Sequence, residues 1–281
     1  MRLVLKEMFT KNSLLCILSL LISLAFLFPL YWILCSSFKG DGEIFRNPPT
    51  IFPRAFTLEP YVSQLTGENS LLKTAKNSFI IATVGMCISF LLAVPAAYGV
   101  THFKFPGSKI MILIFLVTQM LPASLLLTPL FLTYNKLHIL NTYLAPILSV
   151  TTITIPFTLL VLRPMFMACP AEIVESARIE GCNEFSAFMR IVLPTIKPGL
   201  ITVCCFGFVQ GWNDLVYSLT FNSNHMLWPM TTTIYNLMNQ FGTRWNLIMA
   251  YGCILVTPPV LIFIFAQKYI ISGLTSGAVK G

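Results

Sequence analysis

The side chains that could carry out chemistry are few in this sequence. Three histidines, His102, His138 and His225, lie far apart, and the eight cysteines match no Cys/His spacing of a zinc site. The sequence has no H-E-x-x-H metal motif and no G-x-x-x-x-G-K-[ST] phosphate loop. We therefore expect no catalytic residue, no cofactor and no metal in this chain, and an enzyme embedded in its apolar stretches is a poor alternative.

One acidic residue lies within a long apolar stretch. Asp214 follows Asn213, and Gln210 lies about one helical turn earlier. Ionisable side chains in apolar spans usually face a cavity or a partner. Asp214 could contact a transported solute, guard an outer gate or pair with a cation of another subunit. We predict that Gln210, Asn213 and Asp214 belong to a translocation path or gate.

The composition shows what must position these residues. Of 281 residues, 56% are hydrophobic and 10% are charged, and the mean hydropathy is +0.79. Soluble domains carry about 25% charged residues, so the chain could not cover a soluble surface. An ordinary soluble enzyme, a disordered chain and a small disulfide scaffold are excluded. The net charge of +8 comes from residues that flank apolar stretches, which indicates lipid headgroups rather than nucleic acid.

The apolar stretches predict an all-α integral membrane protein with six transmembrane helices. A spanning helix needs about 20 apolar residues, and a strand-built barrel would alternate in polarity instead. Residues 1–281 are predicted to form a single transmembrane domain. The expected spans cover residues 13–35, 77–101, 110–133, 142–162, 199–220 and 246–267.

Lysine and arginine predict the orientation of these helices. They are more numerous in the stretches that share a side with the N-terminus, so both termini are expected in the cytoplasm. The first apolar core is longer than that of a cleaved signal, and we expect it to remain as the first helix. The composition of the outer loop 39–76 gives no chemistry of its own. The polar segment 222–245 is expected outside, where it could dip back into the membrane.

The cytoplasmic loop 163–197 is long for a compact membrane protein, and such loops usually have a function. Pro170 predicts the start of a short amphipathic helix. Ile179 breaks its pattern, because this apolar side chain projects from the polar face. Gly181 permits a tight turn or a close backbone approach. A second helix is expected over 183–192, ending before Pro194.

This loop resembles the EAA loop of ABC-importer permeases, whose pattern is E-A-A, three residues, G, nine residues, I-x-L-P. Six of seven named positions match with unbroken spacing, and Ser176 replaces the middle alanine. The matching residues are Glu175, Ala177, Gly181, Ile191, Leu193 and Pro194.

Other segments extend the resemblance to nearly the whole chain. Trp212-Asn213-Asp214 resembles the W-N-E/D of carbohydrate-type permeases, and Asn77-Ser78, 96–99 and 103–107 resemble their second span. The ending 273–281 is similar to the G-L-T-x-G-x-V-K-G tail of the subfamily that imports sugars and glycerol phosphates.

The resemblance implies a type I ABC importer permease fold and a non-catalytic subunit in a bacterial or archaeal plasma membrane, the inner membrane in a Gram-negative cell. Its implied partners are an ATPase dimer that holds ATP-Mg, a second permease in a heterodimer, and an external solute-binding protein. The loop, including Ser176 and Ile179, would couple ATPase closure to alternating access of the spans. The tail residues Ser276, Gly277, Lys280 and Gly281 would also reach the ATPases.

Three alternatives remain open from the sequence. A secondary transporter or channel would use an ion gradient or no energy source. An ABC permease could carry a non-carbohydrate solute such as an amino acid or phosphate. A homodimer is possible in place of the heterodimer, and the sequence names no particular sugar or polyol.

Overall fold

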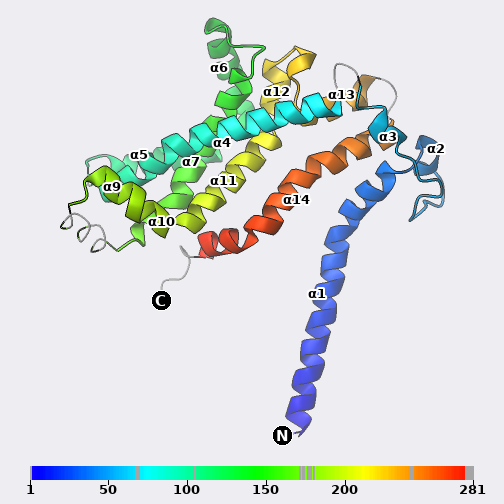
Figure 1. Ribbon diagram of the computed structural model, residues 1–281, viewed down its shortest axis with the longest axis horizontal. Coiled ribbons are helices and arrows are strands. Elements are labelled where there is room, and N and C mark those ends of the chain that lie inside the picture. Colours follow the sequence, from blue (N-terminus) through cyan, green and yellow to red (C-terminus); the bar gives the residue numbers. More distant parts are fainter. Residues whose placement is uncertain are drawn as a thin grey trace. The chain divides into compact units, whose positions relative to one another are not determined.

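The computed structural model describes most of the chain as helices joined by short connections (Figure 1). It does not describe residues 1, 67–69, 104, 171, 173–174, 176–178, 180, 241–243 and 276–281. For residues 2–14, 239–240 and 271–275, only the backbone is described. The described residues contain no β-strand, and the prediction of an all-α protein is confirmed.

The chain divides into two compact units. The first comprises Met1–Thr66 and Asn236–Ile254, and the second comprises Gly67–Tyr235 and Leu255–Gly281. Two helices, α13 (Met230–Gln240) and α14 (Trp245–Thr275), contribute residues to both units. The candidate pocket and coupling loop described below belong to the second unit.

The first unit joins the long helix α1 (Arg2–Ser37) to a folded connection. This connection carries the short helices α2 (Asp41–Ile44) and α3 (Glu59–Val62). Lys39 is 1% exposed, and its ammonium donates to the Thr50 carbonyl oxygen at 2.5 Å. Arg244 pairs with Asp41 at 3.0 Å and with Glu59 at 3.4 Å. These contacts hold residues 39–66 of the predicted outer loop 39–76 in a defined conformation, and the rest of that loop includes the start of α4.

The second unit is built on two long helices, α4 (Leu71–His102) and α7 (Leu144–Met167). Small side chains recur every three or four residues on one face of α4 and are buried, so the neighbouring helices approach closely. The other face of α4 carries exposed leucine and phenylalanine side chains, as a lipid-facing surface requires. The buried small residues are Ser78, Ala82, Gly85, Ser89, Ala93 and Ala97.

A sharp bend divides the predicted span 110–133. It forms α5 (Ser108–Met120) and α6 (Ala123–Lys136), which meet at 102°. Pro122 begins the second helix, and Leu121 before it is extended, with ψ of 128°. A residue that precedes proline is disfavoured in helical conformation, which accounts for the position of the bend.

The second half of this unit begins with α9 (Glu184–Ala187), a π-helix η1 (Phe188–Val192) and α10 (Leu193–Thr195). The predicted fifth span follows as α11 (Lys197–Trp212) and α12 (Val216–Phe221), with a break at 213–215. A 3₁₀ turn η2 (His225–Leu227) then leads to α13.

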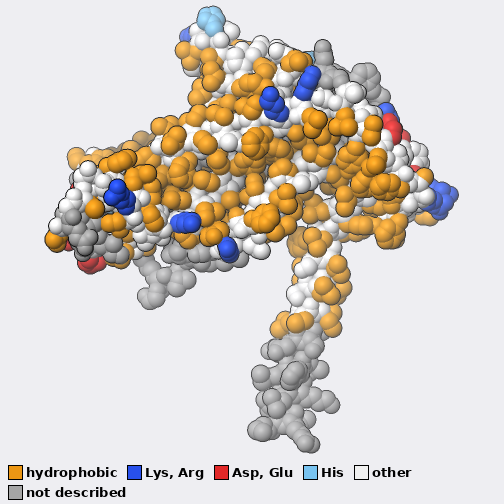
Figure 2. All heavy atoms as spheres, viewed as in Figure 1, with side chains coloured by type: hydrophobic (Ala, Val, Ile, Leu, Met, Phe, Trp, Pro, Cys, Tyr) orange, Lys and Arg blue, Asp and Glu red, His pale blue; other side chains and the backbone are white. Residues whose placement is uncertain are grey.

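Length and composition allow several of these helices to cross a membrane. Four described helices satisfy both criteria, and the number is up to six if each sharply bent helix pair counts as one span. Hydrophobic side chains are spread over the visible face in Figure 2, and few charged side chains lie among them. The prediction of a multi-pass membrane protein is therefore confirmed, with six as the upper limit of this count.

Candidate functional site

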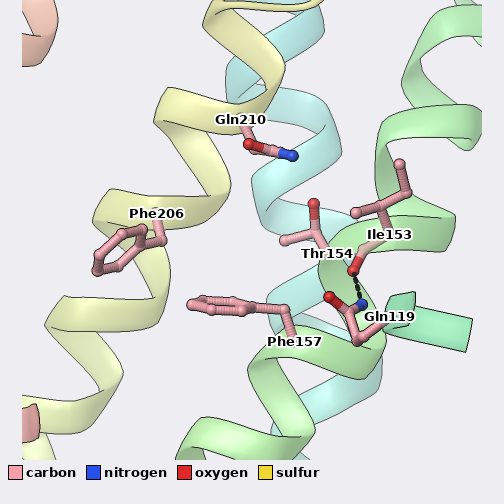
Figure 3. Close-up of a pocket in the computed structure, with 6 residues that line it drawn as sticks. All are labelled: Gln119, Ile153, Thr154, Phe157, Phe206 and Gln210. Carbon is pink, nitrogen blue, oxygen red and sulfur yellow. Dashed lines mark hydrogen bonds between the residues drawn. The ribbon is translucent and has the colours of Figure 1, made fainter. Parts of the chain in front are cut away.

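A pocket lies among α5, α7 and α11, at the level of the middle of their predicted spans. Its volume is about 220 Å³. Its lining is aromatic and amide in character (Figure 3). The six lining residues are Gln119, Ile153, Thr154, Phe157, Phe206 and Gln210.

Helical spacing explains how these side chains converge. Phe206 and Gln210 are four residues apart on α11, so both project from one face of this helix (Figure 3). Their neighbour Gly207 lets α11 approach α7, because a Cβ atom there would lie 3.2 Å from Thr154 Cγ2. The rings of Phe157 and Phe206 have centroids 5.4 Å apart and are tilted by 54°.

The two amides differ in how they are held. Gln119 Nε2 donates to the Ile153 carbonyl oxygen at 2.9 Å, which orients the side chain of Gln119 at the pocket wall. Gln210 makes no side-chain hydrogen bond to any residue that the structure describes. Its donors and acceptor are therefore available to a ligand.

Asp214 lies at the break between α11 and α12 and is 8% exposed. One carboxylate oxygen accepts from the Tyr217 backbone N–H at 3.2 Å. The other accepts from the Ser218 backbone N–H at 2.9 Å and its hydroxyl at 2.7 Å. A carboxylate at the start of a helix satisfies N–H groups that lack helical partners, so Asp214 stabilises the start of α12.

The three polar residues predicted for a path or gate therefore lie at different sites in the structure. Gln210 lines the pocket, whereas Asn213 is the exposed C-terminal cap of α11 and Asp214 caps α12. The other five lining residues, Gln119, Ile153, Thr154, Phe157 and Phe206, were not predicted from the sequence. Gln119 had a visible signal, because it is a polar residue within the apolar stretch 110–133.

Hydrogen bonds attach the external segment 222–229 to the rest of the second unit. The Asn77 amide donates to the carbonyl oxygens of Met226 at 2.9 Å and Trp228 at 3.0 Å. Asn141 Oδ1 accepts from the backbone N–H groups of Ser223 and Asn224, and also from the Ser223 hydroxyl. The connection that follows α12 is therefore held by hydrogen bonds from Asn77 and to Asn141.

The predicted coupling segment is described in part. Glu172, Glu175 and Ile179 are helical and exposed, and Ile179 is 87% exposed. Gly181 has φ of +90°, and a Cβ atom there would meet nothing within 4 Å in this chain. Within this chain, position 181 therefore needs glycine because of its positive φ, which L-residues rarely adopt. Ser176 and Ala177 lie outside the described residues.

The remainder of the loop is packed firmly onto the helices. Asn183 caps α9 by accepting from the Ser186 N–H at 2.8 Å. Ala187, Val192 and Ile196 are buried in a core with Phe166. Ile191 and Leu193 pack against this core. The prediction that the second helix ends before Pro194 is wrong, because the exposed Pro194 lies in the first turn of α10, where a missing N–H is tolerated, and the helical run continues to Thr195. Movement of the segment would therefore be transmitted to α7 and α11.

Apolar side chains at the inner end remain uncovered. Phe185 is 71% exposed and Met189 is 47% exposed, in addition to Ile179. We call Ile179, Phe185 and Met189 the apolar ledge. Exposed apolar groups on a polar loop are typical of surfaces that a protein partner covers. The tail residues Ser276, Gly277, Lys280 and Gly281 lie outside the described residues.

Comparison with known proteins identifies the class of this protein. Residues 85–276 match the family described as "Binding-protein-dependent transport system inner membrane component". The chain belongs to this family, and it is a multi-pass permease of the plasma membrane.

Several relatives match over nearly the whole chain. The diacetylchitobiose uptake system permease protein DasC of Streptomyces coelicolor is 30% identical over 90% of this chain and 92% of its own length. The sulfoquinovosyl glycerol transport system permease protein SmoH of Agrobacterium fabrum is 31% identical, with 91% and 89% covered. The arabinooligosaccharides transport system permease protein AraQ of Halalkalibacterium halodurans is 30% identical, with 90% and 91% covered.

A solved structure shows the same fold. It is a crystal structure of a bacterial ABC transporter involved in the import of the acidic polysaccharide alginate. The TM-score is 0.76 with 19% identity, and the match covers 92% of this chain and 95% of that chain. The predicted type I ABC importer permease fold is confirmed.

Proposed function

We propose that this chain is the permease subunit of an ATP-driven importer of carbohydrates. The apolar ledge is the observation that carries the coupling part of this proposal. Its three side chains are exposed on a loop whose buried residues pack onto α7 and α11, and a partner that moves this loop would move both helices.

The partners follow from this arrangement. An ATPase dimer would cover the ledge and bind ATP-Mg, because this sequence has no phosphate loop of its own. The chain would itself catalyse no reaction. A second permease, in a heterodimer, would complete the pathway, and an external binding protein would deliver the solute. Glu175, Ser176, Ala177, Gly181 and the tail residues Ser276, Gly277, Lys280 and Gly281 would contribute to the ATPase contact.

The proposed cargo class rests on the named relatives. Transport systems for diacetylchitobiose, arabinooligosaccharides and sulfoquinovosyl glycerol all contain permeases similar to this chain. A sugar or a sugar derivative is the chemistry that these three cargoes share.

A photoreactive amino acid at position 179 tests the coupling. We expect crosslinks from this position to the ATPase in the assembled transporter, with a yield that changes when nucleotide is added. Phe45 is a matched control, because it is an exposed apolar residue, 67% exposed, in the predicted outer loop. Crosslinking from position 45 but not from position 179 would refute the coupling proposal. Uptake that continues without the ATPase would indicate a secondary transporter or channel.

A further inference from the structure

We propose that the pocket among α5, α7 and α11 is a subsite for one uncharged sugar ring, so that this subunit itself selects the cargo. The inference rests on the proposed function, because it specifies which carbohydrates the pathway accepts. The named relatives do not decide this point. Their cargoes range from diacetylchitobiose to the acidic polysaccharide alginate of the structurally similar importer.

The lining matches the two kinds of surface on a sugar. Sugar rings carry apolar C–H faces, which pack on aromatic rings, and hydroxyl groups, which donate and accept hydrogen bonds. Phe157 and Phe206 supply two aromatic rings from facing helices. Gln119 and Gln210 supply amides, each of which contains both an acceptor and donors.

The size of the pocket limits how much of a cargo it holds. Pockets that enclose a drug-sized ligand have volumes of about 300–1,000 Å³, and this one is about 220 Å³. It therefore fits one ring of an oligosaccharide rather than the whole chain. Phe206 and Gln210 would contact that ring from one helix, and Phe157 and Gln119 would contact it from two others.

The pocket lining carries no charge, and this excludes acidic sugar rings from the pocket. All six lining residues are uncharged. Asp214, the acid in the break after α11, has both carboxylate oxygens engaged by the start of α12. A carboxylate, sulfonate or phosphate in this pocket would lose its hydration without gaining a cation from the lining, which is strongly unfavourable.

Gln119 would act with a fixed orientation. Its donation to the Ile153 carbonyl oxygen leaves the amide oxygen without a partner among the described residues. That oxygen can accept from a sugar hydroxyl without first being reoriented. A preorganised acceptor favours a ligand with a hydroxyl at that point over one without.

Uptake by cells that carry the complete transporter tests the inference. The probes are labelled uncharged disaccharides and disaccharides of uronic acids, which have a carboxylate on each ring. We expect the preferred cargo to be an uncharged saccharide, taken up at least about tenfold faster than any uronic acid probe. Equal or preferred uptake of an acidic probe would overturn the inference and leave the proposed function standing. Uptake of no carbohydrate at all would refute the proposed function itself.

Substitutions in the pocket then test whether the pocket itself selects the cargo. Phe206→Leu and Gln210→Leu should each raise the KM of uptake by about tenfold, since each removes a cargo contact. Phe79→Leu is the matched control, because Phe79 lies in a separate apolar groove with Phe208 and Trp212. An unchanged KM in both pocket variants, at normal amounts of protein in the membrane, would overturn the inference.

Discussion

The indole Nε1 of Trp212 donates to the Leu255 carbonyl oxygen at 2.8 Å. In a regular helix, the Leu255 carbonyl would accept from the N–H of residue 259. That residue is Pro259, which has no N–H to donate. Trp212, which is 4% exposed, therefore supplies the donor that the proline in α14 removes, and it ties α11 to this point of α14.

A double-mutant cycle measures this relationship. Trp212→Phe should destabilise the protein by about 1–3 kcal/mol, because it leaves a carbonyl without a donor. The same substitution should cost less when Pro259→Ala is also present, because residue 259 then has its own N–H. Thermal unfolding of the four purified forms in detergent gives the coupling energy. Identical costs in both backgrounds would show that Trp212 does not replace the donor that is missing at Pro259.

The close approach of α11 and α4 predicts an effect at Gly211. A Cβ atom there would lie 2.7 Å from Ala82 Cα, which is backbone and must shift. We expect Gly211→Ala to destabilise the protein by about 1–3 kcal/mol, as overpacking does. Gly99→Ala is the control, because its Cβ would meet only Phe103 at 3.9 Å. If both variants have the wild-type melting temperature, α11 and α4 are farther apart than the structure indicates.

We expect the role of Asn141 to depend on the acceptor oxygen of its side chain. It has φ of 57°, and its Oδ1 accepts from two backbone N–H groups and one hydroxyl of residues 223–224. Asn141→Asp keeps an acceptor and should retain the external segment. Asn141→Gly is compatible with the positive φ at this position but loses all three hydrogen bonds. It should increase hydrogen exchange at the backbone N–H groups of 223–224 by about tenfold or more. Equal protection in both variants would contradict this role.

We expect the folded outer loop to be less stable at acidic pH. The backbone N–H of Arg54 and the hydroxyl of Thr50 hold the pKa of the Glu43 carboxyl below its ordinary value. Because the folded pKa is lowered, this stabilisation is fully present above the unfolded pKa of about 4.3 and is lost as the pH falls through the folded pKa. Protease cleavage within 44–56 should therefore increase below about pH 4. Glu43→Gln should remove that pH dependence, and an unchanged pH profile in this variant would contradict the assignment.

The sequence predicted much of this architecture because its signals are local. Long gaps between charges give the helices, and the spacing from Glu175 to Pro194 gives the coupling loop. Asn183 marks the start of the second helix in that loop, because it caps α9, whereas Pro194 does not end this helical run. A cap acts on its immediate neighbours, so its effect is visible without knowledge of the tertiary structure.

The pocket was only partly predictable because it depends on packing between distant segments. Phe157 and Phe206 are two phenylalanines in apolar spans, and nothing local distinguishes them from lipid-facing ones. The 102° bend at Leu121 and Pro122 orients α5 and α6, and hydropathy does not report it. Asp214 was recognised as unusual, but its contacts with Tyr217 and Ser218 depend on the break in the fifth span.

The most direct test of the central claim is ATP-driven uptake by a reconstituted transporter that carries Ile179→Asp. A carboxylate on the apolar ledge would be buried without a cation if an ATPase covers this residue, which costs several kcal/mol. We predict that uptake falls by at least about tenfold and that the ATPase dissociates from the permease, while the amount of inserted protein is unchanged. Wild-type uptake with the ATPase still bound would contradict coupling through this loop.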